Sequence, residues 1–368
     1  MRVLFADQYA QPGGAQLCLR EVMEEARGRG WETHLMTPAS GLPESMAAYG
    51  NGSKSVRDLL AFGPDTIRAA LAMRRVIRRH QIDLVYANGP RVLPAAALAG
   101  GPLLFHAHSY LGTAYARAIA GRCIRARRAT VFAASNFVAG PLRKMRCAAE
   151  IRVIYNGIAD QTFFARSFAS PALTIGIVGR IAPEKGHLDF VRAAHGIAAA
   201  YPATRFVVYG APLFSGDRYE CEVRRAAFGL NLEFKGWTEP IAEALHSIDI
   251  LAVPSASIES LPRVIPEALS AGTPVVAYAS GGIPELMRPR QTCLLTAAPD
   301  SEALASAFRE LLRDRQKMRW LAVNGRLEWE RRFRLERFQR EVCDALQQVV
   351  ERSADLPDPA HAVAGERA

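Results

Sequence analysis

Two cations stand close together in the segment GIVGRIAPEKGHLDF, residues 176–190. Arg180 follows an apolar run typical of a buried strand, and Lys185 comes just before a stretch with helical spacing. A planar guanidinium and an ammonium that converge on one point suit a phosphate or a diphosphate. The alternative is an Arg180–Glu184 ion pair with Lys185 in solvent. The spacing predicts an anion site where this strand ends.

A pair of carboxylates follows in the segment that begins ASIESLPRVIPEALSAGTPVVAY. Between Glu259 and Glu267 stands Pro266, which is best tolerated if the helix begins no earlier than Arg263. The first-turn amides of such a helix are free for a phosphate, and the two carboxylates can hold hydroxyl groups. The alternative is that Glu267 is an exposed helix residue.

Two glycines, Gly13 and Gly14, stand between the first strand-like run and a helical stretch. Glycine allows close approach of the backbone, and a helix N-terminus offers unpaired N–H groups to an anion. A flexible turn is the alternative. Neither a G-x-G-x-x-G nor a G-x-x-x-x-G-K-[ST] motif occurs, which leaves out the dinucleotide fingerprint and the P-loop.

These residues must be positioned by elements that alternate along the chain. Short apolar runs and amphipathic stretches predict an α/β fold with two doubly wound, Rossmann-like domains. The helical stretches include 15–28, 66–80 and a series over 300–352. The expected strands are 2–6, 33–37, 83–87, 102–106, 129–134, 152–156, 174–179, 205–210, 232–236, 249–254 and 274–278.

The same pattern predicts the domain boundaries. We expect an N-terminal acceptor-side domain over 1–160, a linker over 161–172 and a C-terminal nucleotide-binding domain over 173–335. A last helix over 336–352 is expected to pack back on the first domain, and the tail 353–368 has little to bury and is expected to be disordered. Ligands of open parallel sheets bind outside the carboxyl ends of the strands, so a cleft between the two domains is expected.

Composition narrows the class of protein. With 368 residues, 49% of them apolar and 22% charged, the chain is too large for a small binding module and is not collagen-like or disordered. Its six cysteines form no C-x-x-C pair, which argues against a structural zinc site or a disulfide framework and fits a reducing cytoplasm. We expect no signal peptide, and the uncharged stretch 92–116 is interrupted too often to span a bilayer.

The net charge of +10 lies in the first part of the chain. Residues 1–160 hold 21 basic and 11 acidic residues, whereas residues 161–368 hold 25 of each. The segments 73–80, 116–128 and 142–146 interleave cations with apolar residues, a pattern suited to an anionic membrane surface. A solvated basic surface is the alternative. Nucleic acid is not expected as a partner, because no recognition motif accompanies the charge.

The order of these motifs resembles the retaining glycosyltransferases of family 4, which have the GT-B fold. The resemblance rests on the Gly-Gly loop, GRIAPEKG, the Glu259–Glu267 pair with AGTPVVA, and GGIPE, and it extends from Arg2 to about residue 350. It implies transfer of a sugar from a UDP- or GDP-linked donor to a hydroxyl acceptor. Acceptors in this family are often lipid-linked saccharides of the cell envelope, which implies a cytoplasmic protein peripheral on the inner membrane face.

The resemblance also implies roles for residues of the second domain. Glu267 would bind the ribose of the donor, and Glu259 the hydroxyl groups of its sugar. Arg180 and Lys185 would neutralise the diphosphate. Backbone amides would cradle the diphosphate oxygens at Leu261, Arg263 and Val264.

In the first domain the resemblance implies that Gly13 and Gly14 contact the donor. In HAHSY, His108 aligns better than His106 with the family's catalytic histidine, and His106 is expected to be a core residue. The chain departs from the family at Pro262, where members often have Gly, and at Asn88, where a second histidine is usual. The acceptor side is therefore less well defined than the donor side.

The implied mechanism needs no side-chain nucleophile, because the leaving diphosphate takes the acceptor proton. Cations already aimed at the diphosphate stabilise the growing charge. No Asp-x-Asp segment is present, so we expect metal independence and no cofactor besides the nucleotide sugar. The alternatives are a nucleotide-sugar 2-epimerase, whose carboxylates have no counterpart in the first domain, and a nucleotide-sugar-binding protein without catalysis.

Overall fold

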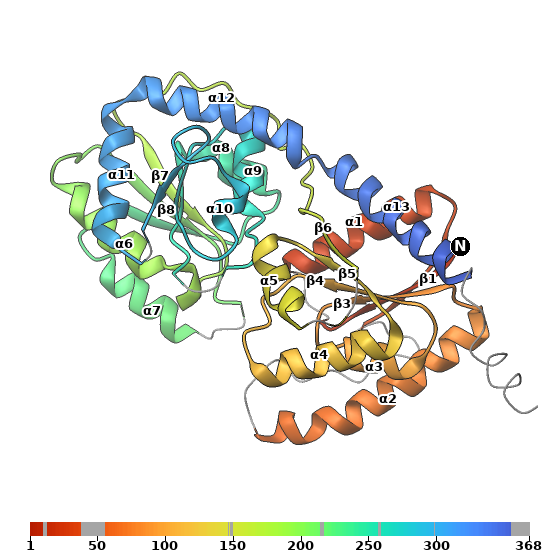
Figure 1. Ribbon diagram of the computed structural model, residues 1–368. Coiled ribbons are helices and arrows are strands. Elements are labelled where there is room, and N and C mark those ends of the chain that lie inside the picture. Colours follow the sequence, from red (N-terminus) through yellow and green to blue (C-terminus); the bar gives the residue numbers. More distant parts are fainter. Residues whose placement is uncertain are drawn as a thin grey trace, which may run out of the picture. The chain divides into compact units, whose positions relative to one another are not determined.

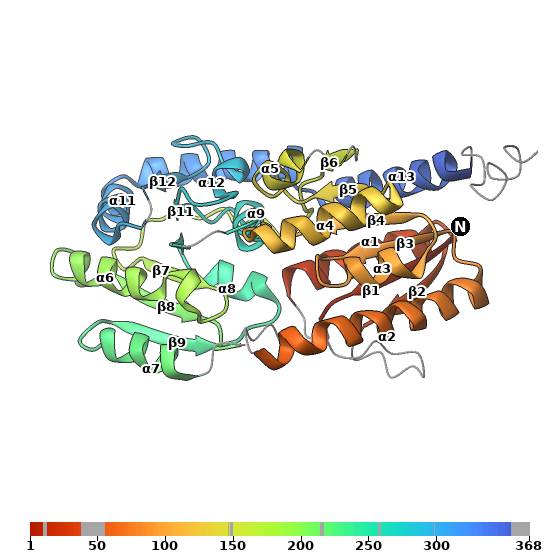
Figure 2. The same ribbon diagram turned by 60° about the horizontal axis from the view of Figure 1, so that its bottom comes forward.

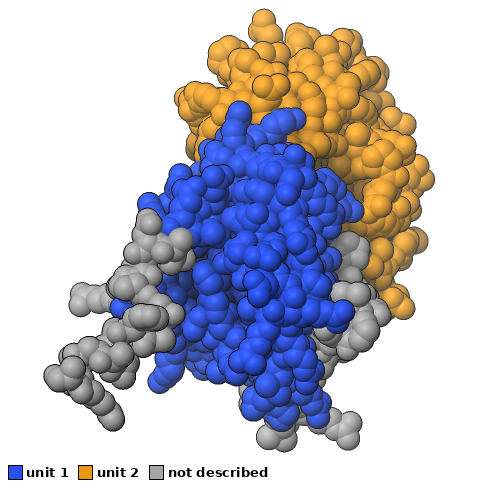
Figure 3. Space-filling view, turned by 90° about the vertical axis from the view of Figure 1, so that its right-hand side faces the viewer, with its two compact units in different colours: residues 1–155, 336–368 blue, residues 156–335 orange. Residues whose placement is uncertain are grey.

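The computed structural model describes residues 1–9, 13–37, 56–145, 147, 150–213, 217–256, 259–297 and 299–354. The chain divides into two compact units, which Figure 3 colours separately. Unit 1 consists of residues 1–155 and 336–368, and unit 2 of residues 156–335. The last helix is therefore part of unit 1. Of the tail over 353–368, residues from 355 onward lie outside the described residues.

Unit 1 is built on a parallel sheet with the strand order β2-β1-β3-β4-β5-β6. Its central strands β3 and β4 are buried at every position, because helices cover both faces (Figures 1 and 2). This double burial explains why their sequences are continuous apolar runs. The strands are β1 (Arg2–Asp7), β2 (Glu32–Met36), β3 (Leu84–Asn88), β4 (Leu103–Ala107), β5 (Thr130–Ala133) and β6 (Ile151–Val153).

The helices of unit 1 form two layers. On one face of the sheet lie α2, α3 and α4, and on the other lie α1 and α13 (Figure 1). Helix α13 is fixed to α1 by polar contacts, since Gln339 donates to the Glu21 carbonyl at 2.8 Å and Arg29 pairs with Asp344 at 2.6 Å. The helices are α1 (Gly14–Gly28), α2 (Val56–His80), α3 (Leu93–Ala99), α4 (Ala114–Arg127), α5 (Asn136–Lys144) and α13 (Leu335–Ala354).

Unit 2 repeats this architecture with the strand order β12-β11-β10-β7-β8-β9, again all parallel. Its core includes Phe190, Phe206 and Phe308, from α6, β8 and α11. The strands are β7 (Thr174–Val178), β8 (Arg205–Tyr209), β9 (Leu232–Gly236), β10 (Ile250–Val253), β11 (Val275–Tyr278) and β12 (Leu294–Thr296). The helices are η1 (Pro183–Lys185), α6 (His187–Ala198), α7 (Asp217–Ala226), α8 (Ile241–Ser247), α9 (Val264–Ala271), α10 (Ile283–Leu286), α11 (Ser301–Arg313) and α12 (Arg315–Arg332).

Residues 161–172, the expected linker, pack on unit 2. Phe168 is buried in its core, and Arg166 donates to the Leu245 carbonyl at 2.6 Å. An irregular segment has no periodicity whether it is packed or free, so the pattern alone does not distinguish the two. The two parallel six-stranded sheets confirm the predicted α/β class with two doubly wound domains.

Candidate functional site

Lys185 lies beside Glu259, the first carboxylate of the pair. It ends the short helix η1, and Gly186 then turns the chain into α6 with a φ of +75°. A Cβ atom on Gly186 would lie 1.8 Å from the Pro254 carbonyl oxygen, so only glycine lets this turn approach the end of β10 so closely. Lys185 Nζ donates to Glu259 Oε2 at 2.5 Å. The turn therefore places a cation against the first carboxylate.

Arg180 has a different partner. Its guanidinium donates to Glu184 Oε1 at 2.9 Å, and both side chains are partly exposed. This is the ion pair that the sequence left open as an alternative, although Lys185 contacts Glu259 and is not simply solvated. A partly exposed pair of this kind contributes little to stability, so Arg180 can exchange Glu184 for an anionic ligand at small cost.

Glu259 is fixed through its backbone by the glycines of GGIPE. Gly282 N–H donates to the Glu259 carbonyl at 2.8 Å. Gly281 has a φ of +55°, and a Cβ atom there would lie 2.0 Å from the same carbonyl oxygen. The Ser255 hydroxyl donates to Glu259 Oε2 at 3.3 Å. The two glycines thus let the loop after β11 close on the segment that carries this carboxylate.

Helix α9 holds the second carboxylate. It begins at Val264, with Arg263 as the cap residue, so Pro266 falls in its first turn, where no backbone N–H is needed. Glu267 is only 8% exposed, and its Oε1 lies 3.8 Å from Arg263 Nε. Glu267 is therefore not the exposed helix residue of the alternative reading. Leu261 and Val264, at the start of the helix, are partly exposed, and Pro262 is buried.

A small hollow of about 20 Å³ lies next to these residues within unit 2. It includes the ends of β7 and β10 and the start of α9, with Lys185, Ser255, Pro262 and Val264 in its lining. A larger and more open groove of about 500 Å³ is lined by Asp189, Tyr219 and Ser301, among others. Neither lining includes Glu259 or Glu267. Size alone favours the groove, but the smaller hollow is lined by Lys185, which contacts Glu259, so the candidate site is assigned to this hollow.

His187 lines the same hollow and was not identified from the sequence. Its side chain is fully buried at the start of α6. Burial, with a smaller contribution from the Lys185 charge, lowers the pKa of this imidazole to about 4. The ring is therefore neutral at physiological pH and adds no charge to the site.

In unit 1, a chain of polar side chains crosses the carboxyl ends of three strands. The Asn88 amide donates to Asp7 Oδ1 at 3.2 Å and to the Ala15 carbonyl at 3.3 Å. Because the amide nitrogen faces these acceptors, Asn88 Oδ1 faces His108 Nε2, 2.8 Å away. Nε2 must then carry the proton and donate it to Asn88. The sequence singled out His108, and the structure adds the two residues that orient it.

Asp7 is buried at the end of β1, and desolvation by burial raises the pKa of its carboxyl. Hydrogen bonds from Asn88 and Gln16 act in the opposite direction, with Gln16 Nε2 donating at 3.0 Å. Gln16 lies in the first turn of α1, which begins at Gly14 with Gly13 as an extended cap residue. The Gly-Gly loop therefore brings the helix start to Asp7.

His106 lies within β4, as the sequence indicated for a core residue. It is fully buried, its Nδ1 is hydrogen-bonded to the Tyr86 hydroxyl, and its ring centroid lies 3.9 Å from that of His108. Burial, and secondarily His108, lowers the pKa of His106 well below its usual value. His106 thus packs beneath His108 as a neutral ring.

Three residues of the candidate sites were not identified from the sequence: Asp7, Gln16 and His187. Asp7 ends the first strand run, so its position next to other strand ends was a usable signal. Gln16 and His187 have no such signal, because their roles depend on which side chains the fold places beside them.

Two family models match the chain. "Glycosyltransferase Family 4" matches residues 12–162, and "Glycosyl transferases group 1" matches residues 172–314. The chain is 27% identical to a phosphatidyl-myo-inositol mannosyltransferase of Mycobacterium leprae over 86% of this chain and 90% of that protein. It is 29% identical to a GDP-mannose-dependent monoacylated alpha-(1-6)-phosphatidylinositol monomannoside mannosyltransferase of Corynebacterium glutamicum, over 49% of this chain and about half (48%) of that protein.

The fold is also that of solved glycosyltransferase structures. Anabaena Alr3699/HepE in complex with UDP matches with a TM-score of 0.79 and 23% identity, over 95% of this chain and 100% of that one. The fold is therefore the GT-B fold. These matches support a glycosyltransferase and not an epimerase. The chain belongs to the family 4 glycosyltransferases.

Proposed function

We propose that the protein is a retaining, metal-independent glycosyltransferase that uses a UDP- or GDP-linked sugar and a lipid-linked or other envelope saccharide as acceptor. The observation that carries the donor side is the arrangement in unit 2, where Lys185, Glu259 and Glu267 surround the start of α9. Cations and first-turn amides suit a diphosphate, and the carboxylates suit hydroxyl groups.

Each charged group has a distinct role in this proposal. Lys185 and Arg180 stabilise the negative charge that grows on the diphosphate as the glycosidic bond breaks. Each such preorganised donor is typically worth about 3 to 4 kcal/mol of barrier lowering. Lys185 leaves Glu259 when the diphosphate binds, which frees this carboxylate for the hydroxyl groups of the sugar. Glu267 is buried against Arg263 and remains fixed for the ribose.

His108, in unit 1, is the catalytic histidine of this proposal. Asn88 Oδ1 accepts the hydrogen bond from Nε2–H, so the ring is held in one orientation. The relatives named above are mannosyltransferases of phosphatidylinositol lipids, which supports an acceptor of that lipid-linked class and GDP-mannose as the first donor to test.

Helix α2 supports docking of unit 1 on an anionic membrane surface. Its exposed residues include Ile67 and Leu71, which are 57% and 48% exposed, and the cations Arg68, Arg75 and Arg78. Apolar side chains among arginines are typical of helices that lie in a lipid interface. Among the described residues, no helix combines the length and the apolarity needed to cross a bilayer.

The decisive test is a product analysis with UDP- and GDP-linked sugars, with and without phosphatidylinositol acceptors. We expect one donor to be consumed with net retention at the anomeric carbon, measured by NMR of the product. Conversion of the donor to an epimer without acceptor would identify an epimerase. Saturable binding of the donor without turnover under any condition would identify a binding protein.

A further inference from the structure

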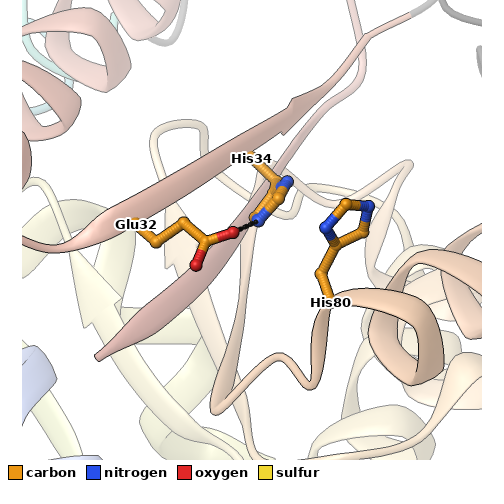
Figure 4. Close-up of side chains that lie close together, drawn as sticks. All are labelled: Glu32, His34 and His80. Atoms are coloured by element: carbon orange, nitrogen blue, oxygen red, sulfur yellow. Dashed lines mark hydrogen bonds and ion pairs between the residues drawn. The ribbon is translucent and has the colours of Figure 1, made fainter.

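Unit 1 brings together two histidines and a glutamate that the proposed reaction does not use (Figure 4). Glu32 and His34 lie two residues apart on β2 and so point to the same side of the strand. His80 is the last residue of α2. One ligand atom from each side chain lies within 4.8 Å of the other two. We propose that Glu32, His34 and His80 form a binding site for a divalent transition-metal ion, with zinc as the expected occupant.

The chemistry of the three groups favours such an ion. Two imidazoles and one carboxylate are the donor set that Zn²⁺, Co²⁺ and Ni²⁺ accept, whereas Mg²⁺ and Ca²⁺ prefer oxygen ligands. His34 Nε2 already lies 2.8 Å from Glu32 Oε1, and the ring centroids of His34 and His80 lie 4.2 Å apart. A metal ion that replaces the proton between His34 and Glu32 is coordinated by both.

The site needs only small side-chain movements. Zinc–ligand distances of about 2.0 to 2.2 Å require ligand atoms closer than the present span. The side chains of His34 and Glu32 are 21% and 55% exposed, so they are free to rotate toward an ion. Their backbones are fixed by the parallel pairing of β2 with β1, in which Glu32 pairs with Arg2.

The local charges set the strength of binding. Glu32 contributes a negative charge, and the C-terminal end of α2 contributes a partial one, which favours a cation near His80. Arg78 and Arg79 lie in the same last turn and repel a cation. The charge of Arg2 is paired with Asp83, 3.7 Å away. With three protein ligands and these cations nearby, we expect weaker binding than in a four-ligand structural zinc site.

The position in the sheet separates this site from the transfer reaction. Glu32 opens β2 and His80 precedes β3, so the cluster lies at the amino ends of the strands. Asp7 and Asn88 close β1 and β3 at the opposite, carboxyl end. A bound ion therefore ties the edge strand β2 to the end of α2 and stabilises unit 1 without touching the reacting groups.

The test is calorimetric titration of the full chain with zinc chloride at pH 7.5, after removal of metals by EDTA and dialysis. We expect one binding event that weakens more than about tenfold in His34→Gln and in His80→Gln. His195→Gln is the matched control, because His195 is an exposed histidine on unit 2, and its zinc binding should equal that of the unmodified chain. Zinc should also raise the Tm of the unmodified chain and not that of His80→Gln.

Unchanged zinc affinity in both His34→Gln and His80→Gln, or no zinc binding by the unmodified chain, would overturn the proposal. Thermal unfolding of each variant in EDTA provides the folding control. If His80→Gln is unstable without metal, Glu32→Gln and His34→Gln decide the question from the strand side. The readouts are independent of catalysis, so failure here leaves the proposed transfer activity untouched.

Discussion

Glu259 and Glu267 are held in different ways, and this difference predicts different phenotypes. Glu267 is buried beside Arg263 and is proposed to bind the ribose, so Glu267→Ala should weaken binding of the free nucleoside diphosphate by about tenfold or more. Glu259 is held by Lys185 and is proposed to bind the sugar, so Glu259→Ala should leave that affinity nearly unchanged and lower turnover. Calorimetry with UDP and GDP measures both. An equal loss of affinity in the two variants would contradict the assignment.

Asn88 makes the orientation of His108 testable. In Asn88→Ala the His108 Nε2–H loses its acceptor, so the ring is no longer held in one orientation. We expect kcat to fall by about tenfold, with a smaller change in KM for the donor. Asn324→Ala, on the surface of α12, is the matched control and should behave as the unmodified enzyme. A change confined to KM would indicate that Asn88 serves binding and not orientation.

The buried imidazole of His187 predicts a pH dependence of stability. The pKa of His187 is about 4 in the folded chain and 6.5 in the unfolded chain. Between these two pH values His187 is protonated mainly in the unfolded chain. The folded state should then lose up to about 1.4 kcal/mol per pH unit until pH 4 is approached. In His187→Gln this part of the slope should disappear from the unfolding of unit 2, measured by urea titration at pH 7 and pH 4.5. An unchanged slope, equal to that of the His195→Gln control, would refute it.

At the residue scale, the sequence predicted candidate site residues from their side-chain type and their place at the end of a strand or the start of a helix. Lys185, Glu259 and Glu267 follow strand ends or open helices, and periodicity reveals such places. The partners of these groups could not be predicted. Whether Lys185 contacts Glu259 depends on a close approach of the Gly186 turn to Pro254, and that is a property of the packed unit.

At the scale of elements, burial on both faces made the strands predictable. β1, β3 and β10 are apolar runs bounded by turn residues, and their observed positions agree with the expected ones to within a residue or two. The sequence pattern missed the three-residue strand β12, Leu294–Thr296, although it marked the equally short β6. Residues 161–172 were expected as a linker because buried anchors such as Phe168 leave no pattern in an irregular segment.

Helix α2 carries the prediction that belongs to this scale. Its exposed arginines flank Ile67 and Leu71, so unit 1 should bind vesicles that contain anionic lipid and release them as salt screens the charges. Arg75→Glu/Arg78→Glu should abolish co-sedimentation at about 0.1 M salt. Arg218→Glu/Arg225→Glu on α7 changes the net charge equally and should leave it intact. Equal co-sedimentation with neutral and anionic vesicles, or an equal loss in both double variants, would show that the exposed arginines of α2 do not dock the protein on an anionic membrane.

At the scale of the whole molecule, the charge distribution and the two repeated folds were visible in the sequence. The net charge of +10 falls in residues that the structure gathers mainly into unit 1, and each unit has its own parallel sheet. The return of α13 to unit 1 follows from contacts such as Arg29–Asp344, which join residues far apart in the chain. A last helix that packs back on the first domain was an expectation from the sequence, but an individual pair such as Arg29–Asp344 depends on three-dimensional proximity that no local pattern encodes.

The source of positive charge for the transfer step is a property of the whole enzyme, and it can be tested by removing metals. If Arg180 and Lys185 stabilise the diphosphate, excess EDTA should leave the transfer rate within about twofold. The same treatment should lower the Tm of a zinc-loaded preparation, because it empties the Glu32–His34–His80 site. His80→Gln should show the same rate and no EDTA-dependent change in Tm. Loss of activity in EDTA that magnesium or manganese restores, in both proteins alike, would show that a metal ion and not these side chains carries the charge.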